Sequence, residues 1–305
     1  MITVVGSLNM DLFVETPTLP RPGETVIGTR FRQSCGGKGA NQAVTIARLG
    51  ARVALIGAVG DDAFGTDLAR SVAASGVNTA AIVRRIGVAS GVALIVVDAK
   101  GQNLITVAPG ANATLSPDDL RPHRATIQSS KALLAPLETP LVTVQAAFQI
   151  ARSVGVPTFL NPAPACPLPP VLAANCDWLM PNETEASRLT GLPVKDAASA
   201  AAASCFIRTE IGVPNVLITL GAQGAWLDGR EFSGHVAAFR VRAIDTVGAG
   251  DTFIGAFVTR LTEGANPEQA ARFASAAAAV AVKRRGAQES IPQREEVEEF
   301  LRIAV

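Results

Sequence analysis

Short, continuous apolar runs alternate with segments of helical periodicity along most of this chain. Such runs are typical of strands that are buried on both faces of a parallel sheet. The predicted strands cover residues 2–5, 53–59, 132–134, 157–160, 178–180 and 215–220. The predicted helices cover residues 43–49, 60–75, 141–154, 186–191, 197–211 and 252–261. The alternation predicts an α/β fold with three layers, α/β/α, around a mostly parallel central sheet.

Two pairs of strand-like segments interrupt this alternation. The first pair, residues 11–16 and 24–32, is separated by a proline-rich stretch that signals turns. The second pair, residues 92–97 and 103–107, flanks a turn that contains Gly101, which is the pattern of a β-hairpin. No helical pattern lies within the first pair, so we expect the four segments to form a small sheet outside the central one.

The composition supports one large domain. The chain has 305 residues, is 48% hydrophobic and 17% charged, and has a formal net charge of +1. No linker or internal repeat divides it, so we predict a single domain over residues 1–305 with a lid formed by about 10–34 and 88–110. The small net charge gives no electrostatic reason to expect nucleic acid or an anionic membrane as a partner.

Cysteine and histidine usage argues against several chemistries. The four cysteines form no Cys-x-x-Cys pair, so neither a zinc site nor a redox motif is indicated, and reduced cysteines fit a cytoplasmic location. Only two histidines, His123 and His235, are present, which argues against a Ser-His-Asp triad or a multi-histidine metal site. No signal peptide is apparent, and no apolar run approaches the roughly 18 residues of a membrane helix.

Polar residues follow several of the predicted strands. Asn9 and Asp11 come after the first strand, Glu138 after the strand at 132–134, and Asn182 and Glu185 after the strand at 178–180. The carboxyl ends of parallel strands share one edge of a sheet, and ligands bind there. We therefore expect these side chains to line a common site.

A glycine turn with Gly37, Lys38 and Gly39 leads into the predicted helix at 43–49. It is not a Walker A loop, because Gly39 stands where that loop has Ser or Thr. The glycines permit close approach of the backbone to a small ligand. Asn41 carries both a donor and an acceptor, which suits sugar hydroxyls.

A second glycine turn, Gly248-Ala249-Gly250, leads directly into Asp251 and the helix at 252–261. Free N–H groups and the helix dipole make such a terminus an anion site. A carboxylate in the first turn can accept a proton from a hydroxyl that attacks phosphorus. By itself the motif also fits a plain turn with a capping aspartate.

Five motifs, taken in order, resemble those of the ribokinase-like (PfkB) carbohydrate kinases, and the resemblance runs from Gly6 to Pro292. The element Gly-Gly-Lys-Gly-Ala-Asn-Gln points to the ribokinase branch of this family rather than to its fructokinases or adenosine kinases. The five motifs are Gly6-Ser-Leu-Asn-Met-Asp11, Pro22-Gly-Glu-Thr25, Gly36-Gly-Lys-Gly-Ala-Asn-Gln-Ala43, Pro181-Asn-Glu-Thr-Glu-Ala186 and Asp245-Thr-Val-Gly-Ala-Gly-Asp-Thr-Phe253.

The resemblance implies a role for each matching position. Asp251 is implied as the general base, next to an anion hole formed by Gly248, Ala249 and Gly250. The implied sugar-binding residues are Asn9, Asp11, Gly37, Lys38, Gly39, Asn41 and Glu138. The implied nucleotide-binding residues are Asn182, Thr219, Gly221, Gly224, Gly250 and Ser275. Glu185 is implied near Mg²⁺, through water, and the implied K⁺ site consists of Asp245, Val247, Ala281, Arg284, Gly286 and Ser290.

The resemblance also implies the reaction: transfer of the ATP γ-phosphoryl group to the 5-hydroxyl of D-ribose, which gives ribose 5-phosphate and ADP. It implies ATP, Mg²⁺ and K⁺ as cofactors and a homodimer that pairs through the lid. The alternatives are a kinase for 2-deoxyribose, another sugar or a nucleoside, and a catalytically silent nucleotide-binding protein. Met10 would tolerate a deoxy sugar if it faced the sugar 2-position, but it can equally pack away from the sugar. A Rossmann dehydrogenase is set aside, since the glycine fingerprint is missing after the first strand.

Overall fold

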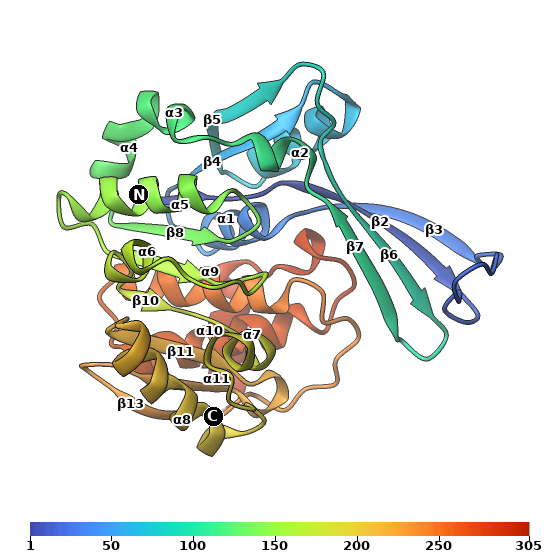
Figure 1. The fold of residues 1–305 in the computed structure, drawn as a ribbon. Coiled ribbons are helices and arrows are strands. Elements are labelled where there is room, and N and C mark those ends of the chain that lie inside the picture. Colours follow the sequence, from blue (N-terminus) through green and yellow to red (C-terminus); the bar gives the residue numbers. More distant parts are fainter. Residues whose placement is uncertain (305) are drawn as a thin grey trace.

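The computed structural model describes residues 1–304. A nine-stranded sheet runs through the centre in the order β13-β12-β11-β10-β9-β8-β1-β4-β5 (Figure 1). All neighbours from β11 to β5 pair in parallel, and only β12 and β13 are antiparallel. The strands are β1 (Ile2–Val5), β4 (Val53–Gly60), β5 (Asn78–Arg85), β8 (Ala132–Pro136), β9 (Thr158–Asn161), β10 (Trp178–Leu179), β11 (Asn215–Thr219), β12 (Ala225–Asp228) and β13 (Ser233–Val236).

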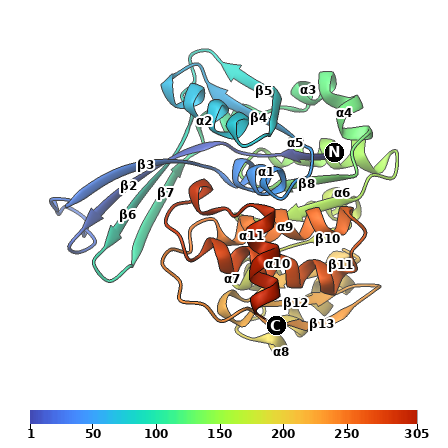
Figure 2. The same ribbon diagram turned by 180° about the vertical axis from the view of Figure 1, so that it is seen from behind.

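Helices cover both faces of this sheet, and each face has its own hydrophobic core. Successive strand residues point to opposite faces, so Val4 joins one core while Val5 joins the other. The first core is closed by α1 (Lys38–Arg48), α2 (Ala63–Ala74), α9 (Ala249–Thr262), α10 (Pro267–Ala281) and α11 (Arg294–Ile303), in front in Figure 2. The second is closed by α3 (Pro117–Leu120), α4 (Arg124–Gln128), α5 (Leu141–Arg152), α6 (Pro170–Ala174), α7 (Glu183–Thr190) and α8 (Ala197–Phe206).

A second sheet of four strands, in the order β3-β2-β6-β7, projects from the main body (Figure 1). It consists of β2 (Asn9–Thr16), β3 (Arg30–Gly36), β6 (Gly91–Asp98) and β7 (Asn103–Ala108). We call this sheet the lid. The β2–β6 pair is parallel, whereas β2–β3 and β6–β7 are antiparallel. The predicted fold class, a three-layer α/β/α body with a small β-sheet lid, is confirmed, while the single domain over 1–305 stays a prediction.

Several elements differ from the prediction. The second lid strand was expected over 24–32 but runs over Arg30–Gly36, because its ladder pairs Arg30 with Glu15 and Gly36 with Asn9. The helix expected over 197–211 ends its α-helical part at Phe206 and continues as a π-helical turn up to Gly212. β5, β12 and β13 were not predicted. They lie towards the two ends of the sheet, and β5 and β13 are edge strands that pair on one side only, which leaves a weak sequence pattern.

Among the helices that the structure describes, none combines the length and the apolar character needed to span a bilayer.

Candidate active site

The second glycine turn forms the N-terminus of α9. Gly248 is the N-cap residue and has a φ of 73°, a conformation that favours glycine. A Cβ atom added to Gly250 would meet nothing within 4 Å, so the space above the helix terminus is open. Asp251 follows in the first turn and is buried, with 8% of its surface exposed. The open terminus faces a cavity of about 230 Å³, whose lining includes Gly248, Gly250 and Asp251.

Both carboxylate oxygens of Asp251 accept hydrogen bonds from α1. Asn41 Nδ2 donates to Oδ2 at 2.9 Å, and Gln42 Nε2 donates to Oδ1 at 3.0 Å. Gln42 Nε2 also donates to Asn161 Oδ1 at 3.1 Å. Gln42 and Asn161 were not predicted as site residues. The sequence contains a signal for both residues, since Gln42 follows Asn41 in the same motif and Asn161 ends a predicted strand.

Lys38 lies near several carboxylates and lines the same 230 Å³ cavity as Asp251 and Glu185. The Asp251 carboxylate is the main cause that raises the pKa of Lys38 above its ordinary value of 10.5, although burial opposes the rise. Glu138, Glu185 and Asp11 add to it. A permanent positive charge is therefore held beside the open helix terminus, where it suits a phosphate group as well as a sugar hydroxyl.

Glu138 organises the predicted sugar side of the site. Its Oε2 accepts hydrogen bonds from Ser7 Oγ at 2.5 Å, from the Lys38 N–H at 3.1 Å and from Asn9 Nδ2 at 3.4 Å. Asn9 Oδ1 in turn accepts from Asn112 Nδ2 at 2.8 Å. Asn112 also bonds the backbone N–H and carbonyl of Leu8, so it fixes which end of the Asn9 amide faces the site. Ser7 and Asn112 were not predicted.

Asp11 is buried at the start of the lid, with 7% of its surface exposed. Burial, together with the nearby carboxylates of Glu138, Asp251 and Glu289, raises its pKa from 3.8 to about 7. A group in this state exchanges a proton near neutral pH, so the charge at the sugar side depends on pH.

The first glycine turn is crowded by the chain itself. A Cβ atom on Gly37 would lie 2.7 Å from the nitrogen of Asn9, and one on Gly39 would lie 2.5 Å from the carbonyl carbon of Gly6. Gly37 also has a φ of 90°. These glycines allow α1 to pack against the loop after β1. This packing brings Asn41 and Gln42 within hydrogen-bond distance of Asp251. From the sequence we expected these glycines to approach a ligand instead, and that role stays a prediction.

A larger cavity of about 650 Å³ opens between the loop after β11 and helix α10. Its apolar wall includes Phe239, Ala278 and Val282, which suits a flat aromatic base. All six residues predicted to bind the nucleotide line it, namely Asn182, Thr219, Gly221, Gly224, Gly250 and Ser275. The cavity shares Gly250 with the 230 Å³ cavity, so one continuous site runs from the base pocket to Asp251.

Asn182 and Glu185 form a reciprocal cap at the start of α7. Asn182 Oδ1 accepts from the Glu185 N–H at 2.8 Å, and Glu185 Oε2 accepts from the Asn182 N–H at 2.9 Å. Burial raises the pKa of Glu185, and the bond from Asn182 and the charge of Lys38 oppose the rise. Within residues 1–304 there is no group of three or more His, Cys, Asp or Glu side chains that could hold a metal ion.

The residues predicted for a K⁺ site lie in two adjoining loops. Asp245 joins them, because its carboxylate accepts the N–H of Val247 and the N–H of Gly286, each at 3.0 Å. The Arg284 side chain points elsewhere and pairs with Glu296, so only its backbone is available here. Two further polar groups are bonded locally: the Ala281 carbonyl accepts from the Arg284 N–H, and Ser290 Oγ donates to the Ala287 carbonyl.

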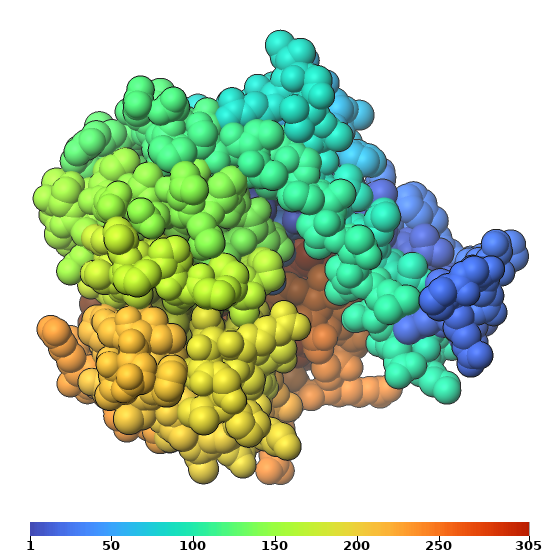
Figure 3. All heavy atoms as spheres, in the orientation of Figure 1, coloured from blue at the N-terminus to red at the C-terminus, as the bar shows by residue number. Residues whose placement is uncertain are grey.

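The site lies at the carboxyl edge of the parallel sheet, beside the lid. Figure 3 shows a hollow between the blue and teal lid and the green and yellow face of the body, with orange and red atoms of the C-terminal part at its floor. An anion site, a buried carboxylate and a base pocket along one hollow are the elements of a phosphotransferase.

Comparison with known proteins agrees with this arrangement. The family model described as pfkB family carbohydrate kinase matches residues 1–294. The chain therefore belongs to the pfkB family and is an ATP-dependent carbohydrate kinase.

Three proteins of known name are similar to this chain over nearly its whole length. The chain is 45% identical over 303 residues to the ribokinase of Haemophilus influenzae, with 99% of both chains covered. It is 39% identical over 305 residues to the deoxyribokinase of Salmonella typhi, again with 99% of both covered. The solved structure of Arabidopsis thaliana ribokinase complexed with ribose and ATP matches with a TM-score of 0.92, 33% identity and 98% of each chain covered.

Proposed function

We propose that this protein transfers the γ-phosphoryl group of ATP to the 5-hydroxyl of D-ribose, which gives ribose 5-phosphate and ADP. The observation that carries the proposal is the position of Asp251. Its carboxylate is held by two amide donors at the open N-terminus of α9, between the residues predicted for the sugar and the cavity predicted for the nucleotide. The ribokinases named above support the choice of sugar.

Each residue has a defined task in the reaction. Asp251 accepts the proton of the 5-hydroxyl as this oxygen attacks the γ-phosphorus. The N–H groups of Gly248 and Gly250 donate to the transferred group, where negative charge is concentrated. The N–H of Ala249 joins them once it leaves the Thr246 carbonyl, to which it donates at 3.2 Å in this structure. The ammonium of Lys38 adds a positive charge to the same cavity. Positioning and electrostatics carry most of the rate enhancement in such reactions.

On the sugar side, Asn9, Asp11, Asn41 and Glu138 orient the hydroxyls. Asn9 presents its NH₂ group, since Asn112 already occupies its oxygen. Gly37 and Gly39 keep the backbone close enough for Glu138 to bond the Lys38 N–H. The lid then closes over the sugar and excludes water.

The residues also fit the groups that the family implies. Thr219, Gly221 and Gly224 hold the phosphates of ATP, with Asn182 beside them and Ser275 next to the base. Glu185 would hold Mg²⁺ through water, because magnesium keeps much of its hydration shell. When bound, Mg²⁺ offsets the charge of the phosphates.

For K⁺, the chain supplies oxygen ligands, which hard cations prefer. They are the Asp245 carboxylate, the Ser290 hydroxyl and the carbonyls of Val247, Ala281, Arg284 and Gly286. Because Asp245 bonds both loops, a cation held here would support the turn that precedes the anion hole.

The second candidate substrate is 2-deoxyribose, which the similarity to a deoxyribokinase favours. Met10 does not favour it. Met10 is 2% exposed and belongs to the main core, whereas Asn9 and Asp11 on either side of it point to the opposite face of β2. Any tolerance for a deoxy sugar must therefore come from residues other than Met10.

A homodimer that pairs through the lid is also proposed. Large apolar side chains are exposed there, including Phe31, Leu94, Leu104 and Ile105. Exposed apolar patches of this kind are typical of protein interfaces. The cytoplasmic location stays a prediction from the sequence.

The experiment that tests the function is a coupled assay of ADP release with ATP, Mg²⁺ and K⁺. D-ribose, 2-deoxyribose, fructose, adenosine and a sugar-free control are compared. We expect the highest kcat/KM with D-ribose. A preference for 2-deoxyribose would keep the mechanism and replace the substrate, and ATP binding without sugar-dependent turnover would contradict the proposed reaction.

A further inference from the structure

We propose that Gln42 and Asn161 are positioning residues, which carry an oriented chain of hydrogen bonds from the main-chain carbonyl of Met180 to the carboxylate of Asp251. The chain has three bonds. Asn161 Nδ2 donates to the Met180 carbonyl at 3.0 Å, Gln42 Nε2 donates to Asn161 Oδ1 at 3.1 Å, and Gln42 Nε2 donates to Asp251 Oδ1 at 3.0 Å. The catalytic meaning of this chain rests on the proposed function.

The direction of the chain follows from its starting point. A backbone carbonyl can only accept a hydrogen bond, so the NH₂ group of Asn161 must face Met180. Its oxygen then faces Gln42, and Gln42 must donate. The NH₂ group of Gln42 has two hydrogens, and the second one points to Asp251.

An unpaired atom supports this assignment. Gln42 is fully buried, and its Oε1 has no hydrogen-bond partner among residues 1–304. An unsatisfied buried acceptor is costly, so it calls for an explanation. Turning the amide around would place an oxygen against the Asp251 carboxylate and against Asn161 Oδ1. The observed orientation therefore keeps the hydrogen bonds to Asp251 and Asn161, and leaves Gln42 Oε1 without a partner among residues 1–304.

These three hydrogen bonds connect the proposed general base, Asp251, to the central sheet. Met180 follows β10, Asn161 ends β9, Gln42 belongs to α1 and Asp251 to α9. Asn41 anchors only the other carboxylate oxygen. With one bond on each oxygen, rotation of the carboxylate is blocked. A carboxylate has about four acceptor positions, so it can still accept the sugar hydroxyl.

The test uses Gln42→Met, which removes the donor at similar size, and Asn161→Leu, which breaks the chain one step further away. The matched control is Thr259→Val. Thr259 is fully buried on the same helix as Asp251, but its hydroxyl bonds only the Gly255 carbonyl. For all variants, kcat, both KM values and the pH profile of kcat are measured.

We expect kcat to fall by about 10- to 100-fold in Gln42→Met and less in Asn161→Leu, with KM for the sugar within about 3-fold, because misplacing a reacting group affects the transition state most. The acid limb of the kcat profile should move to higher pH, since an N–H donor favours the ionised carboxylate. Thr259→Val should keep the wild-type kcat and profile.

A wild-type kcat and acid limb in Gln42→Met would overturn the proposal, and so would a loss of kcat without movement of the acid limb. A crystal structure of Gln42→Met gives a readout that needs no turnover. A rotated Asp251 carboxylate supports the proposal even if the wild-type protein phosphorylates no tested sugar, and an unmoved one refutes it. The proposed function and this inference can thus fail separately.

Discussion

Ser34 on the lid strand β3 donates to both carboxylate oxygens of Glu289, at 3.0 and 2.9 Å. Glu289 stands beside Ser290 in the loop proposed for K⁺. This contact links the lid to that loop across 255 positions of sequence.

We therefore expect Ser34→Ala to raise KM for the sugar by about 3- to 10-fold and to raise the K⁺ concentration needed for half-activation, with little change in kcat. Loss of a hydrogen bond to a charged group is worth roughly 1.5–3 kcal/mol when that group is left unpaired. Steady-state kinetics at several K⁺ concentrations measure both effects. Thr29→Ala is the control, since Thr29 bonds only Glu15 within the lid. Equal kinetics in the two variants would refute the link.

Asp251→Asn should fold normally and lose turnover by about 10³-fold or more, because general-base catalysis contributes roughly 10²–10⁴-fold. The isosteric amide keeps the shape of the site but cannot accept the proton. Turnover by the coupled assay and thermal unfolding are the two measurements. Turnover close to that of the wild type would remove Asp251 as the base.

Asp11 gives a pH dependence of stability. Its pKa in the folded protein, about 7, lies above the ordinary value of 3.8, so between these values the folded protein binds more protons than the unfolded chain. The contribution of Asp11 to stability is thus full below about pH 4 and is lost as the pH rises towards 7.

Asp11→Asn should remove the free-energy cost of ionising a buried carboxyl group at position 11. We expect the variant to be more stable than wild type at pH 8, by up to about 4 kcal/mol at roughly 1.4 kcal/mol per pKa unit, and the gain to vanish near pH 4. Its KM for ribose should rise. Urea unfolding at pH 4, 6 and 8 measures the gain, and a gain independent of pH would contradict the assigned cause.

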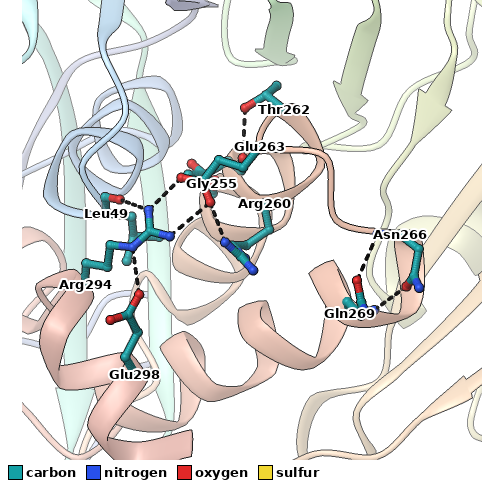
Figure 4. Close-up of polar contacts among 10 residues, drawn as sticks. Leu49, Gly255, Arg260, Thr262, Glu263, Asn266, Gln269, Arg294 and Glu298 are labelled. Atoms are coloured by element: carbon teal, nitrogen blue, oxygen red, sulfur yellow. Dashed lines mark hydrogen bonds and ion pairs between the residues drawn. The ribbon is translucent and has the colours of Figure 1, made fainter.

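Arg294 connects three helices at the back of the body, as Figure 4 shows. Its guanidinium bonds Glu263 at 2.6 and 3.1 Å, Glu298 at 2.9 Å and the Leu49 carbonyl at 3.1 Å. Burial disfavours the charged form of Glu263, but hydrogen bonds from Arg294 and Arg260 lower its pKa below 4.5.

Arg294→Met should lower the free energy of unfolding by about 1–3 kcal/mol at pH 7, because the Leu49 carbonyl loses its donor and the Glu263 carboxylate keeps only the donor on Arg260. The stabilisation tied to the low pKa of Glu263 is present above pH 4.5 and is lost as the pH falls further. Urea unfolding at pH 7 and pH 3.5 tests this. The difference between variant and wild type should shrink at pH 3.5, and an equal difference at both pH values would exclude the ion pair as its source.

The proposed dimer predicts that Phe31→Ser/Ile105→Ser sediments as a monomer at concentrations where the wild type is a dimer, since both side chains are more than half exposed on the lid. Val154→Ser, at an exposed apolar position of the body, is the control. Sedimentation equilibrium measures the mass, and a wild-type monomer would exclude the dimer.

Local patterns in the sequence predicted much of this molecule. The strands at 2–5 and 53–59 and the helix after the glycine turn at 248–250 appear within a few residues of the expected bounds. Apolar periodicity and glycine placement depend on near neighbours, so one chain suffices to detect them. The resemblance added the candidate residues, and the structure brings the six predicted nucleotide-binding residues to one cavity.

What the sequence alone determined is the alternation of the main parallel strands with helices and the chemistry available at the strand ends. The tertiary structure decided which edges the sheet has, where β3 begins, and which way each buried amide points. Gln42 reaches Asn161 across 119 positions and Asp251 across 209, and no local pattern encodes such contacts. Orientation of a donor depends on the partner it meets, so the held carboxylate of Asp251 exists only in the folded chain.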